Sequence, residues 1–287
     1  MSKLRTNKVY IVGTLTQVKD VREGEKDGVR WIGGTAVIKS GDNDIETKFY
    51  SSEKTKAGKS NVKYSIYTKL ADRVNERVKI NGDVLGRIWF SPREGQLITF
   101  NEINAGFFNT PRVDEEDAAT FEYGGFVYKP IQERQNKDGE LIGYEIQIAQ
   151  ANFNNNNMQV VKFFVDKDRT DIVSAIESQY PKNTTVEIMG NIMYEVTNEV
   201  RTEEVSFGSP IQKIIPVTRK ALVINGGKEA ILDEAIAYSQ EDISELETSY
   251  RNFMEATEQA AKNRADSGDM SPNNTTPAKS DNINRFM

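Results

Sequence analysis

The chain has 287 residues, a net charge of −6, no cysteine and no histidine. These absences exclude disulfides, thiolate zinc sites, cysteine nucleophiles and imidazole general bases. No apolar stretch is long enough to span a bilayer, and the N-terminus lacks an apolar signal core. We therefore expect a soluble intracellular protein without membrane contact, metal or cofactor.

The positive charge is concentrated at the start of the chain. Residues 1–111 hold 19 Lys and Arg against 13 Asp and Glu, whereas residues 112–226 hold 12 against 18 and residues 227–287 hold 6 against 12. A basic third on an acidic chain indicates a polyanionic partner for that third. The alternative is chance clustering of solvated surface charge.

The first third predicts three strands, a helix and two strands. Apolar and polar residues alternate from Val9 to Leu15, which is the period of a half-buried strand. Ile66, Leu70 and Val74 recur every fourth residue, which predicts an amphipathic helix after a polar, lysine-rich loop. The predicted elements are strands over 9–15, 31–39 and 45–50, a helix over 64–75, and strands over 78–90 and 96–105.

The same order returns after an acidic segment over 112–118, which we interpret as a linker. A Val-x-Ile-x-Gly pattern follows each helix and ends at Gly82 and Gly190, and Gly13 in the first strand has a counterpart in Gly125. This placement favours duplication of one domain, although any two five-stranded domains look alike at this level. The second set comprises strands over 121–131, 144–150 and 159–165, a helix over 168–180 capped by Asp168 or Thr170, and strands over 186–196 and 211–224.

Three strands, a helix and two strands in about 100 residues are the order of an OB fold, a five-stranded Greek-key barrel. A strand glycine permits the sharp bend that barrel closure requires. We therefore predict an all-β protein with minor helices, made of two tandem OB-fold barrels. The predicted domains cover residues 1–111 and 119–227.

A predicted helical segment over 228–265 follows the second barrel. Its residues Ile243, Leu246, Tyr250 and Phe253 have a 3-4-3 spacing. Such a seam packs either on the protein's own barrels or on a partner helix. The remaining residues, 266–287, are rich in Ser, Pro, Asn and Thr and predict a disordered tail.

Two stretches of the first domain resemble bacterial single-stranded DNA-binding proteins. Asn7 to Leu15 resembles the first strand of that family. Leu85, Arg87 and Trp89 after Gly82 are similar to its fourth strand, where a tryptophan seven residues after the glycine stacks on bases. The third-strand tryptophan of the family is absent here.

The whole chain is similar to two-barrel single-stranded DNA-binding proteins of phages that infect Gram-positive bacteria. Their second barrel starts with the sequence found here at 124–130. This resemblance implies single-stranded DNA as partner, a role in phage DNA replication and recombination, and the host bacterial cytoplasm as location. Whether copies associate on DNA is left open by the sequence.

Binding of single strands without sequence preference requires cations for the backbone and exposed aromatic rings for the bases. The candidate stacking residues of the first domain are Trp31, Tyr50 and Trp89, and Phe49 is a weaker candidate. Trp31 and Phe49 are alternatively core residues. The candidate cations are Arg5, Lys8, Lys39, Lys48, Lys54, Lys56, Lys59, Arg87 and Arg93.

Two other regions carry candidates. In the second domain Tyr128, Lys129 and Phe153 are comparable residues, but the acidic balance there leaves weak DNA contact and a purely structural role both open. The chain end, with Ile283 and Phe286, resembles the partner-docking tip of single-stranded DNA-binding proteins. It implies phage or host replication proteins as partners, and the alternative is an end without function.

We predict a non-enzymatic protein that binds and protects single-stranded DNA. The alternative is a phage virion or assembly protein that uses OB barrels for protein contacts. The basic first domain with Trp89 favours DNA, and the acidic second domain favours protein. An enzyme is the least supported class, because the chain lacks His, Cys and a recognisable nucleophile or metal set.

Overall fold

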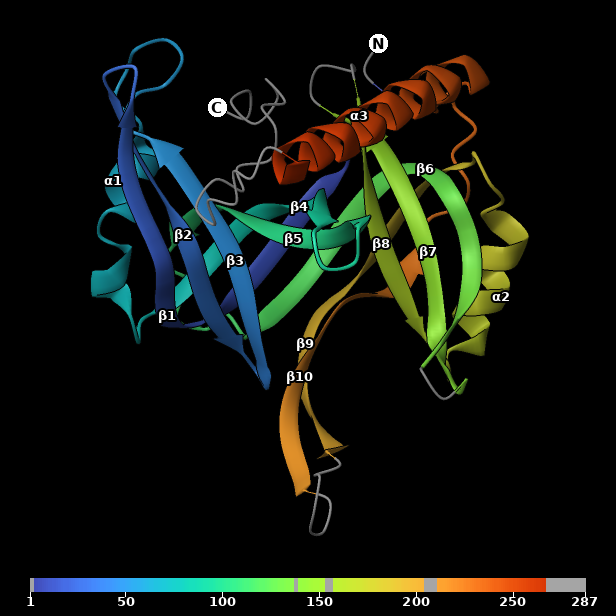
Figure 1. The fold of residues 1–287 in the computed structure, drawn as a ribbon, viewed down its shortest axis with the longest axis horizontal. Helices are drawn as coiled ribbons and strands as arrows, with labels where there is room; N and C mark the ends of the chain where they lie inside the picture. The colour runs from blue at the N-terminus through green and yellow to red at the C-terminus, as the bar shows by residue number, and fades with distance from the viewer. Residues whose placement is uncertain (1–2, 137–138, 153–156, 204–210, 267–287) are drawn as a thin grey trace.

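The computed structural model describes residues 3–136, 139–152, 157–203 and 211–266. Strands dominate it, α1 and α2 flank two barrels, and α3 lies across the top of the view in Figure 1. The strands are β1 (Asn7–Lys26), β2 (Val29–Ser40), β3 (Asn43–Ser52), β4 (Arg77–Ser91), β5 (Gln96–Asn109), β6 (Ala118–Gln135), β7 (Leu141–Ala151), β8 (Met158–Asp166), β9 (Thr185–Glu203) and β10 (Ile211–Gly227). The helices are α1 (Val62–Tyr67), α2 (Thr170–Gln179) and α3 (Gln240–Asp266).

Each set of five strands closes on itself. In the first set β1 pairs with β2 and β4, β2 pairs with β3, and β5 joins β3 to β4. The second set repeats this pattern from β6 to β10. This strand order, with a helix after the third strand, is that of the OB fold. The predicted pair of OB barrels with minor helices is therefore confirmed.

Four strand glycines occupy equivalent places in the two barrels. Gly13 and Gly82 in the first barrel correspond to Gly125 and Gly190 in the second. A Cβ atom at any of the four would lie 1.9 to 2.2 Å from a carbonyl oxygen of a neighbouring strand. Only glycine permits so close an approach of two backbones. The shared register supports the interpretation that one domain was duplicated.

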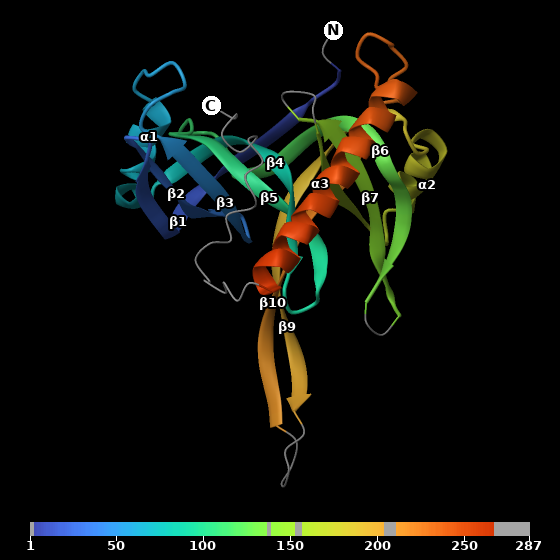
Figure 2. The ribbon, with the colours of Figure 1, turned by 45° about the horizontal axis from the view of Figure 1, so that its top comes forward.

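The two barrels form one continuous sheet through antiparallel pairing of β1 with β6, in which Val9 lies opposite Phe121. Val9 also faces Gly82 in the first barrel, as Phe121 faces Gly190 in the second. Equivalent residues therefore meet each other, as at the two-fold axis of an isologous dimer. The hairpins follow the same symmetry, since β4 contacts β8 and β9 contacts β3. Beyond these contacts β9 and β10 extend away from both barrels as a ribbon (Figure 2).

The predicted three-turn helix over 64–75 is wrong in extent. α1 ends at Tyr67, and a separate 3-10 turn follows at Leu70–Arg73. The buried Tyr67 hydroxyl donates hydrogen bonds to two carbonyls of β5, and Asn75 has a left-handed φ of 74°. The chain thus leaves the helical path after Tyr67, so that Tyr67 and Leu70 are both buried at the end of the barrel.

Two further helix predictions need correction. The residue before α2 is Arg169, and no side chain caps that helix, so neither Asp168 nor Thr170 has the predicted role. The C-terminal helix begins at Gln240 and not near 228. Ser239 and Asp242 exchange hydrogen bonds there as a capping box, which fixes the start of α3.

The acidic segment over 112–118 is docked on the first barrel. Glu115 accepts hydrogen bonds from Lys79 at 2.8 Å and from the Tyr10 hydroxyl, and these two donors hold its pKa at about 2. Asp117 pairs with Arg77 at 2.8 Å. The charges of Lys79 and Arg77 on β4 are thereby paired within the chain, and the acidic segment is fixed against β1 and β4.

Glu46 on β3 ties the two barrels together. Burial opposes its ionisation, but hydrogen bonds from Lys19, at 2.6 Å, and from Lys220 on β10 hold its pKa at about 2. A carboxylate with a lowered pKa adds stability above its ordinary pKa of 4.5, and this contribution is lost as the pH falls toward 2. We expect Glu46→Gln to lower the free energy of unfolding by about 1 kcal/mol at neutral pH.

Urea unfolding at several pH values tests this expectation. The difference between wild type and Glu46→Gln should shrink steadily below about pH 4.5. Glu255→Gln, on an exposed position of α3, is the matched control and should change stability little. A Glu46→Gln difference that stays constant down to pH 3 would contradict the proposed charge pairing.

Candidate nucleic-acid interface

Trp31 and Tyr50 lie side by side on the outer face of β2 and β3. Their ring centroids are 5.9 Å apart with the planes tilted by 30°, and Tyr50 is 47% exposed. In the ladder Tyr50 faces Gly33, two residues from Trp31, so both rings project from the same side. OB folds bind oligonucleotides on the face of their second and third strands. The structure therefore brings two predicted stacking residues together on that face.

Both rings rest against glycine backbone. A Cβ atom on Gly24 of β1 would lie 2.7 Å from the Trp31 ring, and one on Gly33 would lie 3.2 Å from the Tyr50 ring. The absence of side chains at these two positions leaves room for the rings to lie along the sheet. The glycines of β1 and β2 thus shape the site without contributing a chemical group.

Two cations share this face. Lys48 is exposed two residues from Tyr50, and its ammonium group donates to the Thr35 hydroxyl at 2.6 Å. Arg22 is exposed on β1, in register with Gly33. Sequence analysis missed Arg22 because the polar stretch from 16 to 26 lacks the alternation of a strand. We name Arg22, Trp31, Lys48 and Tyr50 the β2–β3 patch.

The lysine-rich loop flanks the β2–β3 patch. The loop leaves β3 after Ser52, which pairs with Trp31, and the Glu53 amide donates to the Arg30 carbonyl at 2.8 Å. A bridge between residues 54 and 60 closes the loop on itself. The loop therefore starts beside the end of β2 that carries Trp31. The exposed lysines of this loop are Lys54, Lys56 and Lys59.

A second aromatic group lies on the β4–β5 hairpin. Trp89 faces Ile98, and Arg87 faces Phe100, so the four side chains share one side of the hairpin. Trp89 is 42% exposed and Phe100 is 43% exposed. The Arg87 guanidinium pairs with Glu102 at 2.8 Å. We name Arg87, Trp89, Ile98 and Phe100 the hairpin patch.

The two patches project from the same side of the strands of the first barrel, and Tyr194 of β9 is buried on that side close to Glu46 and Glu102. Lys48 of β3 is in register with Asn104 of β5, which lies on the same side of β5 as Phe100. Sequence analysis missed Phe100, because a strand aromatic gives no sign of which side it faces. The predicted cation Arg93 is exposed at the tip of the same hairpin.

Other predicted residues of the first barrel lie elsewhere. Lys8 pairs with Glu122 at 3.0 Å across the β1–β6 junction. Lys39 is exposed near the end of β2 opposite to Trp31. The eight residue steps between the two positions span about 26 Å of extended strand. Arg5 lies beside the buried phenol of Tyr238. Phe49 is a core residue.

The second barrel does not repeat the β2–β3 patch. The equivalent glycines Gly13 and Gly125 show which residues of the two barrels correspond. A Cβ atom on Gly13 would meet the Lys39 carbonyl, and one on Gly125 would meet the Ala149 carbonyl, so Lys39 corresponds to Ala149. The β7–β8 face is therefore matched to the β2–β3 face residue by residue. The positions of Trp31, Lys48 and Tyr50 are occupied by Leu141, Phe164 and Asp166.

Helix α3 covers part of the β7–β8 face (Figure 1). Its residues Ile243, Leu246 and Tyr250 are buried in one cluster with apolar side chains of β7 and β8, so the predicted seam packs on the protein's own barrel. Tyr128 meets Tyr250 edge-on, with centroids 6.2 Å apart, and is thus held under the helix. Lys129 is exposed. The predicted residues Phe153, Ile283 and Phe286 lie outside the described residues.

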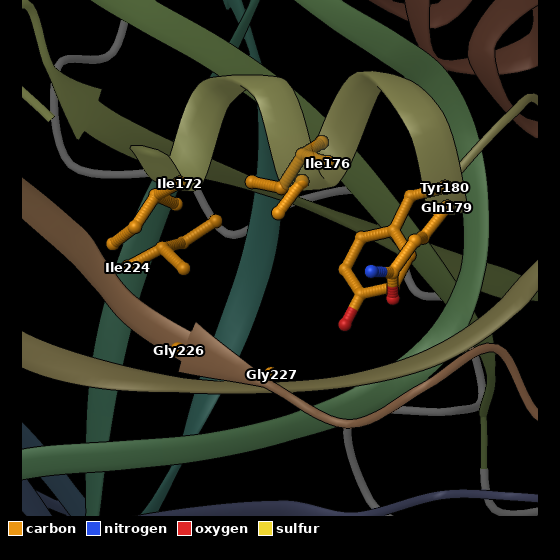
Figure 3. A pocket seen from close by; sticks show the side chains of 8 residues that line it. Ile172, Ile176, Gln179, Tyr180, Ile224, Gly226 and Gly227 are labelled. Carbon is orange, nitrogen blue, oxygen red and sulfur yellow. The ribbon is translucent and has the colours of Figure 1, made fainter. Parts of the chain in front are cut away.

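A hollow at the far end of the second barrel lies between α2 and the end of β10 (Figure 3). The Tyr180 hydroxyl donates to the Lys228 carbonyl and closes one edge. None of the residues that line the hollow carries a charged side chain. It is lined by Ile172, Ala175, Ile176, Gln179, Tyr180, Ile224, Gly226 and Gly227.

Among the residues that the structure describes, no three acidic side chains are grouped to hold a metal ion. None of the helices in this part of the chain is long and apolar enough to cross a membrane.

Comparison with known proteins gives one family. No curated protein sequence matches the chain. Among solved structures, the wild-type single-stranded DNA-binding protein of Thermus aquaticus is similar, with a TM-score of 0.45 and 11% identity over 82% of this chain and 97% of that one. A deletion variant of that protein is similar with a TM-score of 0.44 and 10% identity, over 83% of this chain and 98% of the variant's chain. The profile of the YorF family matches residues 5–262, from the segment before β1 into α3. The chain therefore belongs to the YorF family.

Proposed function

We propose that the protein binds single-stranded DNA without sequence preference through the outer face of its first barrel. The observation that carries this proposal is the pair of neighbouring rings, half-buried Trp31 and exposed Tyr50, on the second and third strands of an OB barrel. Arg22, Lys48 and the lysine-rich loop supply cations for the phosphates beside these rings. Stacking platforms together with a cationic surface are what a sequence-tolerant binder of single strands requires.

The alternative function, protein contact in a virion or in assembly, rested on the acidic second barrel. The β7–β8 face of that barrel is partly occupied by α3, and Leu141 and Asp166 stand at the positions of the Trp31 and Tyr50 rings. DNA binding by the first barrel is therefore the better supported function. A role in phage DNA replication and recombination in the host cytoplasm is the part of this proposal that rests on sequence resemblance.

Titration of intrinsic tryptophan fluorescence with oligo-dT at several salt concentrations tests the proposal. If the protein neutralises roughly 3–6 phosphates, the logarithm of the association constant should fall with that of the salt concentration at a slope of about −2 to −4. Unrelated single-stranded sequences should bind alike and duplex DNA much more weakly. Equal affinity for duplex and single strands would contradict the proposal.

We further propose, from the sequence, that residues 266–287 dock replication proteins through Ile283 and Phe286. Removing these residues should leave oligo-dT affinity unchanged or slightly raised, because residues 266–287 hold three acidic residues against two basic ones. Pull-down with purified helicase, primase and polymerase of the host measures docking, and Phe286→Ala should reproduce most of its loss. A truncated protein that keeps these partners but no longer binds DNA would overturn the assignment.

A further inference from the structure

The hairpin patch belongs to the first barrel in sequence but is anchored on the second. The Asn101 amide spans the boundary, because its Nδ2 donates to the Lys162 carbonyl at 2.6 Å and its Oδ1 accepts from the Lys162 amide at 3.1 Å. The Lys162 ammonium group returns a hydrogen bond to the Thr99 carbonyl at 3.0 Å. Lys162 of β8 is thus held to β5 by three hydrogen bonds, two through its backbone and one through its side chain.

Packing reinforces this anchorage on the side of the hairpin opposite Trp89. Gly86 touches β8 so closely that a Cβ there would lie 1.9 Å from the Val160 carbonyl oxygen. Ile88 packs against the apolar cluster beneath α3, which Met254 also joins. Both views show α3 running from the second barrel toward β4 and β5 (Figures 1 and 2). The hairpin therefore has one side buried on the second barrel and one side that presents Trp89.

A two-stranded hairpin that extends beyond its barrel is marginally stable when it stands alone in water. Fixing mobile side chains or loops on binding costs free energy, and a site that is already ordered avoids that cost. Burial lowers the pKa of Lys162, so the structure places a partly desolvated ammonium group on the Thr99 carbonyl. Such a contact fixes the hairpin at one position relative to β8.

We propose that the second barrel and α3 are a positioning platform for the hairpin patch, with Asn101 and Lys162 as positioning residues. They hold Trp89 and Phe100 on the same side of the first barrel's strands as the β2–β3 patch and raise affinity for single strands without contacting them. This inference rests on the proposed function and assigns the second barrel a role in it. It accounts for a barrel that keeps the fold but lacks the aromatic pair.

The test measures oligo-dT affinity of full-length variants in a cycle of substitutions. Asn101→Ala should weaken binding by about 3- to 10-fold, within the range of coupling through packed networks. In the background Trp89→Ala with Phe100→Ala, the same substitution should change affinity less than about twofold, because no stacking residue remains on the hairpin to be positioned. Lys162→Met, which removes the hydrogen bond to Thr99, should act in the same direction as Asn101→Ala. Lys228→Ala, which breaks a surface ion pair with Glu187 in the second barrel, is the matched control.

A second measurement does not depend on DNA. Trp31→Phe leaves Trp89 as the sole tryptophan, since the chain has two. Asn101→Ala in that protein should lower the fluorescence anisotropy of Trp89 and raise its quenching by acrylamide, while the unfolding transition by circular dichroism stays cooperative. An unchanged Trp89 signal would overturn the positioning role even if Asn101→Ala weakens DNA binding.

The outcomes separate the inference from the proposed function. If Trp89→Ala with Phe100→Ala weakens binding and Asn101→Ala does not, the positioning role is wrong and the DNA-binding function stands. Equal weakening by Asn101→Ala in both backgrounds would show an effect unrelated to the hairpin patch and would also overturn the inference. If wild-type protein binds no oligo-dT at all, the proposed function fails, and the anisotropy measurement alone then decides whether the hairpin is held by the second barrel.

Discussion

Replacement of both Trp31 and Tyr50 by alanine is expected to weaken oligo-dT binding by about 30-fold or more. A base stacked on an aromatic side chain contributes about 1–3 kcal/mol, and about 1.4 kcal/mol corresponds to a factor of ten. Because the two rings are neighbours, their combined loss should fall short of the sum of the single losses. Anisotropy of a fluorescent oligo-dT at fixed low salt measures the change.

The second barrel supplies the matched control for this experiment. Leu141→Ala with Asp166→Ala changes the two positions that correspond to Trp31 and Tyr50, and affinity should stay the same or rise slightly as a negative charge is removed. Circular dichroism should show both double variants folded. If the second-barrel pair weakened binding and the first-barrel pair did not, the interface would be assigned to the wrong barrel.

The largest expected loss of stability comes from Phe163→Ala. The Phe163 ring is buried on β8, 5.3 Å from the ring of Phe121 and 5.1 Å from that of Tyr123. Removing a buried aromatic ring leaves a cavity and lowers the free energy of unfolding by about 3–5 kcal/mol. Phe121 and Tyr123 lie on β6, which pairs with β1, so the loss should reach both barrels.

Urea unfolding followed by circular dichroism measures this loss. Phe107→Ala is the control, because Phe107 is exposed on β5 and its contact is with the Lys63 ammonium group. It should cost about 1 kcal/mol or less. Similar losses for the two variants would mean that the aromatic cluster at β6 and β8 is not a centre of the core.

The strand order could be predicted because its causes are local. Alternation of apolar and polar residues marks strands such as that beginning at Val9. Glycines such as Gly82 and Gly190 are required because neighbouring strands of a small barrel approach too closely there for a Cβ atom. The helix over 64–75 was overestimated, because the periodicity of Ile66, Leu70 and Val74 does not show that Tyr67 is tied to β5. That hydrogen bond joins residues 38 apart in the chain.

The candidate site could be predicted only in part. Trp31, Lys48 and Tyr50 were identified singly, but their grouping depends on the register between β2 and β3. Arg22 was missed because β1 continues as a strand through a polar stretch. The sequence could not predict where the acidic segment and α3 pack either, because both positions depend on contacts between distant parts of the chain.

The internal two-fold axis between Val9 and Phe121 has a consequence for how such a protein can change. In a dimer of identical chains every substitution occurs twice, so neither copy can acquire a feature that the other lacks. Here the two halves are separately encoded, and a ring added to one face leaves its counterpart untouched. One half carries a surface of rings and cations, while a helix covers part of the corresponding face of the other. Each molecule therefore presents this surface once, where a symmetric pair would present it twice.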